Sequence, residues 1–459
     1  MRRLLGASLA LLVLAAVPGH GAGFALFEHS ARGLGSAFAG EAAIAEDAST
    51  TWYNPAGLTL LEGTQFVSSG FAIITAAQFH NEGSHLNPAV IGTGPLRGGD
   101  GNDAGAHGLI PTFFLSHQLT SRVSLGFGVS TPFGLSTTYE PTWVGRYHAI
   151  SSNLETVNVN PSIAVKLTDW LSVGGGADIE YAKARLTNAL DMGSICQVFG
   201  AQMGIPPGAC IAFLKLRPQS ADGFVKVSGD DWNAGYNLGF LFRPAETWRI
   251  GLAYRSKIHH TLGGQAHFDV PPAARPLINA SHGALVSTGA HASADFPERV
   301  SLSAFDQLTR QWALLADITW THWSRFDEPV FKFDNPKQPD IVQPEGWRDS
   351  FRYSVGGRWT PFRRWVFRLG TAYDEGTVPN AMLRTPRIPE SDRVWLAAGA
   401  GYQLFDRVQV HLGYAHLFIL EKSIENPDPV TGHILRGRYT AEADIVGVQF
   451  TYQVGWPPL

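Results

Sequence analysis

Apolar and polar residues alternate with a period of two along much of this chain. Between residues 122 and 130, an apolar residue stands at every odd position from 123 and a small or polar residue at every even position. The same alternation returns in residues 171–181 and 446–454. A period of two is typical of β-strands with one apolar face, so the chain is predicted to be all-β.

The pattern predicts fourteen strands, separated alternately by short turns and by long loops. Short turns on one side and long loops on the other are typical of outer-membrane β-barrels, which close with an even number of strands. An even number also places both ends of the barrel on the periplasmic side. The predicted strands cover residues 64–80, 105–118, 121–137, 152–167, 170–187, 230–243, 247–262, 293–307, 311–325, 348–360, 364–375, 391–405, 407–420 and 438–454.

The polar faces of these strands favour a transmembrane barrel over a soluble sandwich. A soluble sheet exposes a face rich in Lys and Glu, whereas here the polar faces carry mainly Gly, Ser, Thr, Gln and isolated charges. Such residues suit a crowded lumen, with the apolar face turned to lipid. The charges expected in the lumen are Asp178, Arg249, Arg255, Asp317, Arg368 and Asp374.

Tryptophans support the same interpretation. Four of them stand at or just after predicted short turns, where amphipathic rings would form a girdle at one membrane interface. The core of a soluble fold would not place them at equivalent turns. They are Trp170, Trp248, Trp312 and Trp365.

The segment between a leader and the first strand breaks the alternation. Residues 22–62 are rich in small residues and contain an Asn54-Pro55-Ala56 turn. We interpret this segment as a hatch that plugs the barrel formed by residues 63–459. A barrel of this size would leak without a plug, so the hatch argues against an open general porin.

Residues 1–21 have the features of a secretory signal peptide. Arg2 and Arg3 precede an apolar run over residues 4–17, and small residues follow, so cleavage is expected before Ala22. Beyond this leader no run of 18 apolar residues occurs, so no transmembrane helix is predicted. The protein is therefore expected to be exported to the outer membrane of a Gram-negative bacterium.

Composition agrees with export and limits the possible partners. Charged residues make up 16% of the chain, below the roughly 25% of an ordinary soluble domain. This leaves a large secreted β protein or an outer-membrane barrel, and the net charge of −4 gives no sign of nucleic-acid binding. Cys196 and Cys210 lie in one predicted loop and could pair in an oxidising compartment, but the sequence leaves both the paired and the free state open.

The third predicted strand carries an anomaly. Its alternation runs cleanly to Ser130 and then meets Thr131-Pro132-Phe133-Gly134, after which apolar residues continue. Proline cannot donate to a β-ladder and glycine weakens it, so the sequence predicts a gap in the barrel wall here. The alternative is that the strand simply ends and a loop begins.

Enzymatic signatures are missing from the sequence. It contains no G-x-S-x-G, H-E-x-x-H, P-loop or C-x-x-C motif, so no catalytic residue, cofactor or metal is expected. Residues 98–103 could offer carboxylates to Ca²⁺, although a flexible turn has the same composition.

Short motifs in a fixed order give the chain a resemblance to a known family. They occupy residues 23–24, 33–35, 39–41, 44–48, 54–56, 132–135, 160–162, 296–299, 320–324, 373–375, 385–389, 392–393 and 413–416. In this order they resemble the FadL family (OmpP1/FadL/TodX), outer-membrane transporters for long-chain fatty acids and other hydrophobic compounds. The resemblance covers nearly the whole mature chain and implies a monomeric fourteen-stranded barrel filled by a hatch.

The resemblance also implies roles for particular residues. The mature N-terminus, here Ala22 and Phe24, would help to form the ligand site. The turn Asn54-Pro55-Ala56 would abut a kink at Pro132-Phe133-Gly134 that opens sideways. Hydrophobic cargo would then pass passively from the lumen into outer-membrane lipid.

One departure from the family pattern bears on the cargo. Fatty-acid members place basic residues in the lumen where this chain has Asn188 and Gln343, so aromatic hydrocarbons are expected beside long-chain fatty acids as cargo. Lys183, Arg185 and Arg348 lie nearby in sequence and could compensate. The alternatives are a gated channel for polar solutes and an outer-membrane lipid hydrolase.

Overall fold

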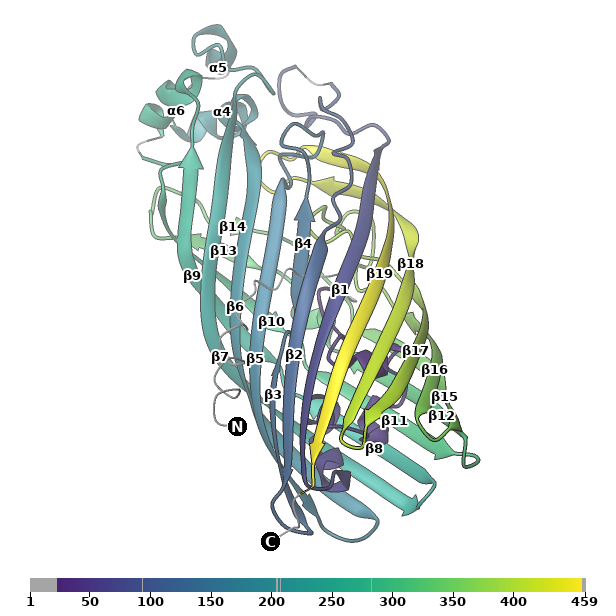
Figure 1. Cartoon of the computed structure of the whole chain (residues 1–459). Helices are drawn as coiled ribbons and strands as arrows, with labels where there is room; N and C mark the ends of the chain where they lie inside the picture. Colours follow the sequence, from purple (N-terminus) through teal and green to yellow (C-terminus); the bar gives the residue numbers. More distant parts are fainter. Residues whose placement is uncertain (1–22, 93, 204, 207, 282, 456–459) are drawn as a thin grey trace, which may run out of the picture.

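The computed structural model describes residues 23–92, 94–203, 205–206, 208–281 and 283–455. These residues form a closed antiparallel barrel of fourteen strands whose lumen holds the N-terminal segment (Figure 1). The barrel closes because the first strand pairs with the last, from Thr64 opposite Val454 to Asn81 opposite Gly437. The predicted fold and strand number are confirmed. No helix within these ranges is long and apolar enough to cross a membrane.

Ten of the fourteen barrel strands are continuous and four are interrupted. The continuous strands are β1 (Thr64–Asn81), β2 (His107–Gln118), β5 (Ser151–Lys166), β6 (Leu171–Asp191), β7 (Asp222–Ala245), β15 (Ser350–Phe362), β16 (Trp365–Asp374), β17 (Arg393–Phe405), β18 (Val408–Pro427) and β19 (Ile434–Val454). The interrupted strands are β3 (Val123–Ser130) with β4 (Gly134–Thr138), β8 (Trp248–Arg255) with β9 (Ile258–Asp269), β10 (Thr288–Phe296) with β11 (Arg299–Gln307), and β12 (Trp312–Thr321) with β13 (Val330–Phe333). The short β14 (Ile341–Val342) pairs with β13.

Short helices lie in the lumen and above the barrel. The hatch, described from residue 23 to residue 62, contains α1 (Ala31–Leu34), α2 (Glu41–Ile44), α3 (Thr50–Tyr53) and η1 (Pro55–Leu60). The long connections carry α4 (Met192–Phe199), η2 (Gly200–Met203), α5 (Ala209–Ala212), η3 (Pro272–Ala274), α6 (Arg275–Ala280) and η4 (Trp323–Arg325). In Figure 1, α4, α5 and α6 cap the end with the long loops, opposite the short turns.

Residues predicted to face lipid or lumen do so. The four girdle tryptophans, Trp170, Trp248, Trp312 and Trp365, are 40–49% exposed on the outer surface beside the short turns. The charge of Asp178 is buried and paired with Arg255, whose guanidinium lies 3.6 Å from the centre of the Trp52 ring of the hatch.

Several strands continue beyond the residues that alternation predicted. For example, β7 begins at Asp222 rather than at residue 230. In its lower part Leu238 and Phe240 face outward, whereas Val225 and Val227 near its upper end line an internal cavity. The apolar face thus changes sides along a single strand, because water replaces lipid outside the barrel above the membrane. The prediction of strands from an outward apolar face therefore holds only for residues within the membrane and misses the parts of the strands above it.

The hatch docks closely against glycines of the wall. A Cβ atom at Gly251 of β8 would lie 1.9 Å from the carbonyl oxygen of Ala42, and one at Gly370 of β16 would lie 2.2 Å from the carbonyl of Ser36. Any larger residue would collide with hatch backbone at these positions. The glycines of the polar strand faces therefore serve as contact points for the hatch.

A buried ion network fixes the same segment. Arg32 of α1 lies 3.1 Å from Glu41, 2.7 Å from Glu46 and 3.0 Å from Asp47. Glu46 also lies 2.8 Å from Arg368 of β16 and pairs with Arg358 of β15. The network therefore joins the hatch helices to one another and to the barrel wall.

We expect Arg32→Met to destabilise the protein by about 3–5 kcal/mol, because it leaves buried carboxylates without their cation. Equilibrium unfolding by guanidinium in detergent measures this change. The matched control is Arg438→Met, which removes a half-exposed ion pair at the rim and should cost about 0–1 kcal/mol. Equal effects of the two substitutions would show that the Arg32 network does not anchor the hatch.

Candidate ligand cavity and wall gap

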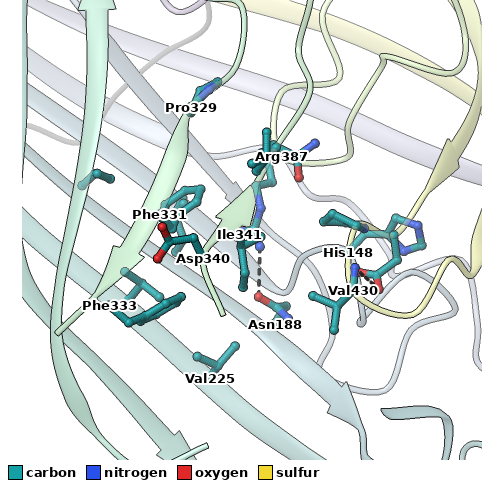
Figure 2. A pocket seen from close by; sticks show the side chains of 18 of the residues that line it. His148, Asn188, Val225, Pro329, Phe331, Phe333, Asp340, Ile341, Arg387 and Val430 are labelled. Carbon is teal, nitrogen blue, oxygen red and sulfur yellow. Dashed lines mark hydrogen bonds between the residues drawn. The ribbon is translucent and has the colours of Figure 1, made fainter. Parts of the chain in front are cut away.

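A large apolar cavity lies above the hatch. Its volume is about 640 Å³, within the range of small-molecule sites. Figure 2 shows Phe331, Phe333 and Val225 on one side of it and His148, Asn188 and Arg387 on another. Other apolar residues that line it are Phe24, Leu135, Leu154, Leu186, Leu190, Ile195, Val227, Leu262, Phe268, Phe296, Phe326, Ile341 and Ile388.

The floor of the cavity is an aromatic cluster around the tip of the hatch. The Phe24 ring centre lies 4.8 Å from Trp323, 5.2 Å from Phe326 and 5.5 Å from Phe296. It also lies 5.7 Å from Phe133, and Phe24 is only 1% exposed. The predicted site residue Phe24 therefore forms the boundary between the cavity and the hatch.

The wall is interrupted next to this aromatic cluster. Within the described residues β4 has ladder partners on β5 alone, and residues 107–112 of β2 pair only with β1. The predicted interruption at Pro132-Phe133-Gly134 thus separates the upper parts of two neighbouring barrel strands. Backbone pairing with β5 resumes at β4, so the strand does not simply end at Ser130.

Hatch backbone fills the interruption. The Leu26 amide donates to the Pro132 carbonyl at 2.8 Å, and the Gly134 amide donates to the Phe24 carbonyl at 2.9 Å. Ala25 and Phe133 form an isolated antiparallel bridge between these two bonds. In lipid an unpaired backbone group costs several kcal/mol, and this short pairing satisfies two such groups.

The Asn54-Pro55-Ala56 turn lies elsewhere, contrary to the expectation that it abuts the kink. The Asn54 amide nitrogen donates to the Phe240 carbonyl of β7 at 3.0 Å, and a Cβ at Gly174 of β6 would meet Ala56 backbone at 2.6 Å. The turn fits there because these strands carry glycine on their inner face. Of the predicted site residues, the structure thus brings Phe24 together with residues 132–134, while residues 54–56 anchor the hatch. Ala22 and the predicted signal peptide lie outside the described residues.

The polar end of the cavity is organised by Arg387, which sequence reasoning did not identify. Its guanidinium donates to Asn188 at 3.0 Å (Figure 2) and to Ser152 at 3.2 Å. No carboxylate of the described residues lies within 4.0 Å of it. Arg387 belongs to the motif at residues 385–389, which pointed to the family but not to a role for this side chain.

The basic residues expected to compensate for Asn188 and Gln343 do not reach the cavity. Lys183 and Arg185 are exposed and alternate on β6 with the cavity-lining Ala184 and Leu186, so they face outward. Arg348 is exposed and its Nε donates to the Gly376 carbonyl at 3.1 Å. Strand parity and loop geometry therefore exclude all three, and Arg387 takes their place beside Asn188.

Electrostatics keep Arg387 charged and its neighbour neutral. Burial lowers the pKa of Arg387 to about 10, so the guanidinium stays positive at neutral pH. Burial raises the pKa of Glu345, another residue lining the cavity, to about 8, against the opposing effects of a hydrogen bond from Trp347 and of Arg387. At pH 7 the cavity thus offers a cation that has no carboxylate partner within 4.0 Å among the described residues, and Asp428, which also lines the cavity, acts on it only from a longer distance.

His148 adds a polar atom to the same end. Its Nε2 donates to the Asn426 carbonyl at 2.9 Å, while the buried Nδ1 has no partner among the described residues. Burial lowers the pKa of His148, so the ring is neutral and Nδ1 is an acceptor.

The outer loop above the cavity is held by a disulfide between Cys196 and Cys210, whose Cα atoms are 6.0 Å apart.

The acidic turn at residues 98–103 is occupied by backbone contacts. Asp103 accepts from the amides of Ala77 and Gly105, both at 2.8 Å. Across the described part of the chain no three His, Cys, Asp or Glu side chains are grouped so as to hold a metal ion.

Comparison with known proteins identifies the family. A family model described as outer membrane protein transport protein (OMPP1/FadL/TodX) matches residues 12–454. The chain belongs to this family. The predicted family and the outer-membrane location are confirmed.

Relatives in this family and solved structures agree over most of the chain. The chain is 29% identical over 402 residues to a long-chain fatty acid transport protein of Salmonella typhi, which covers 86% of this chain and 87% of the relative. It is 30% identical over 432 residues to a putative outer membrane protein of Neisseria meningitidis, with 90% of each covered. A Pseudomonas aeruginosa FadL homologue has the same fold, with a TM-score of 0.84 at 24% identity over 94% of this chain and 100% of that one. The toluene transporter TodX of Pseudomonas putida has a TM-score of 0.68 at 18% identity, over 94% and 99%.

We expect Arg387→Gln to weaken binding of laurate to the purified protein by about 10–100-fold, because a hydrogen bond to a charged group is lost. Isothermal titration in detergent measures it, with dodecanol as the uncharged probe. Dodecanol binding should change less than about threefold, and Arg348→Gln is the matched control. Equal loss for both probes would assign Arg387 a structural role instead.

Laurate binding should also depend on pH through Glu345. Below about pH 8 this carboxyl is protonated and neutral, and above it the ionised carboxylate partly neutralises Arg387. Binding to the wild-type protein should therefore weaken between pH 6.5 and pH 9, whereas Glu345→Gln should bind equally at both values. A wild-type affinity that does not change over this range would contradict this coupling.

Proposed function

We propose that this protein mediates passive uptake of hydrophobic amphiphiles, with long-chain fatty acids as the favoured cargo. The observation that carries the proposal is an apolar cavity that has at one end a cation without a direct ion pair among the described residues, and at the other a hatch-filled wall gap. Curated relatives named as long-chain fatty acid transport proteins support the same cargo class.

The cavity suits a molecule with one apolar and one anionic end. Phe331 and Phe333 offer apolar surface to a chain, and Arg387 offers a charged donor to a carboxylate. Compact aromatic hydrocarbons are weaker candidates, because they would leave the guanidinium without an anion. Their uptake rests on likeness to the fold of solved toluene transporters.

Lateral release follows from the energetics of the cargo. At about 0.8 kcal/mol per buried CH₂, a long acyl chain would lose on the order of 10 kcal/mol on entering the aqueous periplasm. Passage through the gap at residues 132–134 would deliver it to lipid instead. The affinity of the chain for the bilayer then drives transport without another energy source.

The tip of the hatch is the proposed gate, whereas the rest of the hatch stays fixed. Two backbone hydrogen bonds and the aromatic contacts of Phe24 hold the tip at the gap, and Leu26 adds apolar packing against wall residues such as Ile73. The residues from Arg32 onward are held by the buried ion network. Since cavity and gap lie in one barrel, the chain is proposed to act as a monomer.

We expect Pro132→Val combined with Gly134→Val to reduce uptake of labelled oleate at least tenfold, because a regular third strand would close the gap. Uptake is measured in a transporter-deficient Gram-negative strain. The matched control is Pro161→Val in the continuous strand β5, where proline faces outward away from the gap.

Oleate and toluene are tested side by side, and heat-dependent mobility on gels reports folding of each variant. Full uptake by the folded double variant would reject lateral release. Absence of uptake by the wild-type protein, with ion conductance in planar bilayers, would favour a polar-solute channel.

A further inference from the structure

Aromatic residues on the outer face of the strand pair β6–β7 mark the two boundaries of the membrane. At the lower edge the rings of Trp170 and Phe242 are 5.6 Å apart, and about midway along the two strands those of Tyr181 and Trp232 are 5.2 Å apart. From Trp170 to Tyr181 the strand rises about 36 Å along its own axis, at roughly 3.3 Å per residue. With a tilt of about 40° this is roughly 28 Å along the membrane normal, close to the apolar band of such barrels.

A reversal of strand polarity marks the same boundary independently. Up to Tyr181, apolar side chains of β6 such as Ile179 face outward. Beyond it, the inward-facing Ala184 and Leu186 line the cavity, and the outward positions are Lys183 and Arg185. The outer surface therefore changes from lipid-facing to polar between residues 181 and 183.

Three cations follow directly above this boundary on the outer face. Lys183 lies opposite Glu155 on β5 and Asp230 on β7, so it is locally balanced. Arg185, one step higher, lies opposite the uncharged Asn153 and Ser228.

Lys226 faces the same side, because its strand neighbours Val225 and Val227 line the cavity. It lies opposite Thr187 on β6 and His267 on β9. In this register Arg185 and Lys226 are diagonal neighbours, which places their Cα atoms about 7–8 Å apart.

The same register makes Glu155 and Asp230 diagonal neighbours of Arg185 and makes Asp269 a diagonal neighbour of Lys226, but none of these carboxylates forms an ion pair with either cation. No carboxylate of the described residues lies within 4.0 Å of Arg185 or Lys226. Elsewhere on the rim, by contrast, Arg438 lies 3.2 Å from Glu82 and 3.7 Å from Glu421. The outer face of β6–β7 thus presents a diagonal pair of cations at the height of lipid headgroups, which extend about 5–8 Å beyond the hydrocarbon core.

We propose that Arg185 and Lys226 bind a phosphate of the outer-leaflet glycolipid, lipid A. The planar guanidinium can hold two phosphate oxygens, and the lysine ammonium adds a point charge on the other side. The acyl chains of lipid A would run down the apolar face formed by Val157, Ile179 and Trp232, which are all exposed below the cations. This site lies on the outside of the barrel and does not depend on the proposed transport function.

Binding of purified diphosphoryl lipid A to the detergent-solubilised protein, followed by native mass spectrometry, tests the proposal. We expect Arg185→Gln with Lys226→Gln to weaken binding at least tenfold, and Arg438→Gln to leave it within twofold. Dephosphorylated lipid A should bind at least tenfold more weakly to the wild-type protein and equally to all variants. High salt should weaken only binding of the phosphorylated lipid.

The charge-conserving exchange Arg185→Lys with Lys226→Arg should retain most of the affinity and excludes a folding defect as the cause. Equal binding of diphosphoryl lipid A to the wild-type protein and to the glutamine variant would overturn the proposal. So would failure of the wild-type protein to prefer the phosphorylated lipid.

Discussion

A barrel wall in lipid must pair every backbone hydrogen-bonding group, and this constraint governs the site. The third strand is broken at Pro132-Phe133-Gly134, so its neighbours cannot satisfy all of these groups. The hatch supplies the missing partners through the backbone of Phe24 and Leu26. The same contact that seals the wall therefore also places Phe24 in the floor of the cavity.

A seal of this kind is useful only if the rest of the hatch holds its position. Glycines on the inner face, such as Gly251 and Gly370, allow hatch backbone to approach the wall. Arg32 pairs with three hatch carboxylates, and one of them, Glu46, also pairs with the wall. Breaking this network would leave buried charges without partners, whereas releasing the tip breaks two backbone hydrogen bonds and the apolar contacts of Phe24 and Leu26. This difference in the kind of contact supports the proposal that the tip moves while the body of the hatch stays fixed.

The cavity has opposite chemistry at its two ends. Aromatic rings around Phe24 form the floor, and Arg387 with Asn188 forms the polar end. Burial raises the pKa of Glu345 to about 8, so near neutral pH this neighbour leaves the positive charge of Arg387 in place, and Asp428 acts on that charge from a longer distance. In the proposed function, this asymmetry would orient an amphiphile with its apolar end toward the wall gap.

The sequence by itself determined the barrel, its fourteen strands, the girdle of tryptophans and the position of the break, because these follow from alternation and from the backbone chemistry of proline. Family motifs led to Phe24 but placed the Asn54-Pro55-Ala56 turn at the wrong strand, since only packing shows that it fits Gly174 and Gly239. Lys183 and Arg185 were expected to be able to compensate for the missing lumen cations, because nothing in a one-dimensional pattern marks where the membrane ends. Above that level water lies outside and the apolar cavity inside, so the strand faces exchange roles. Only the tertiary structure shows on which side each residue lies. It also places Arg387, from a loop distant in sequence, beside Asn188, where a basic residue of the strand had been expected.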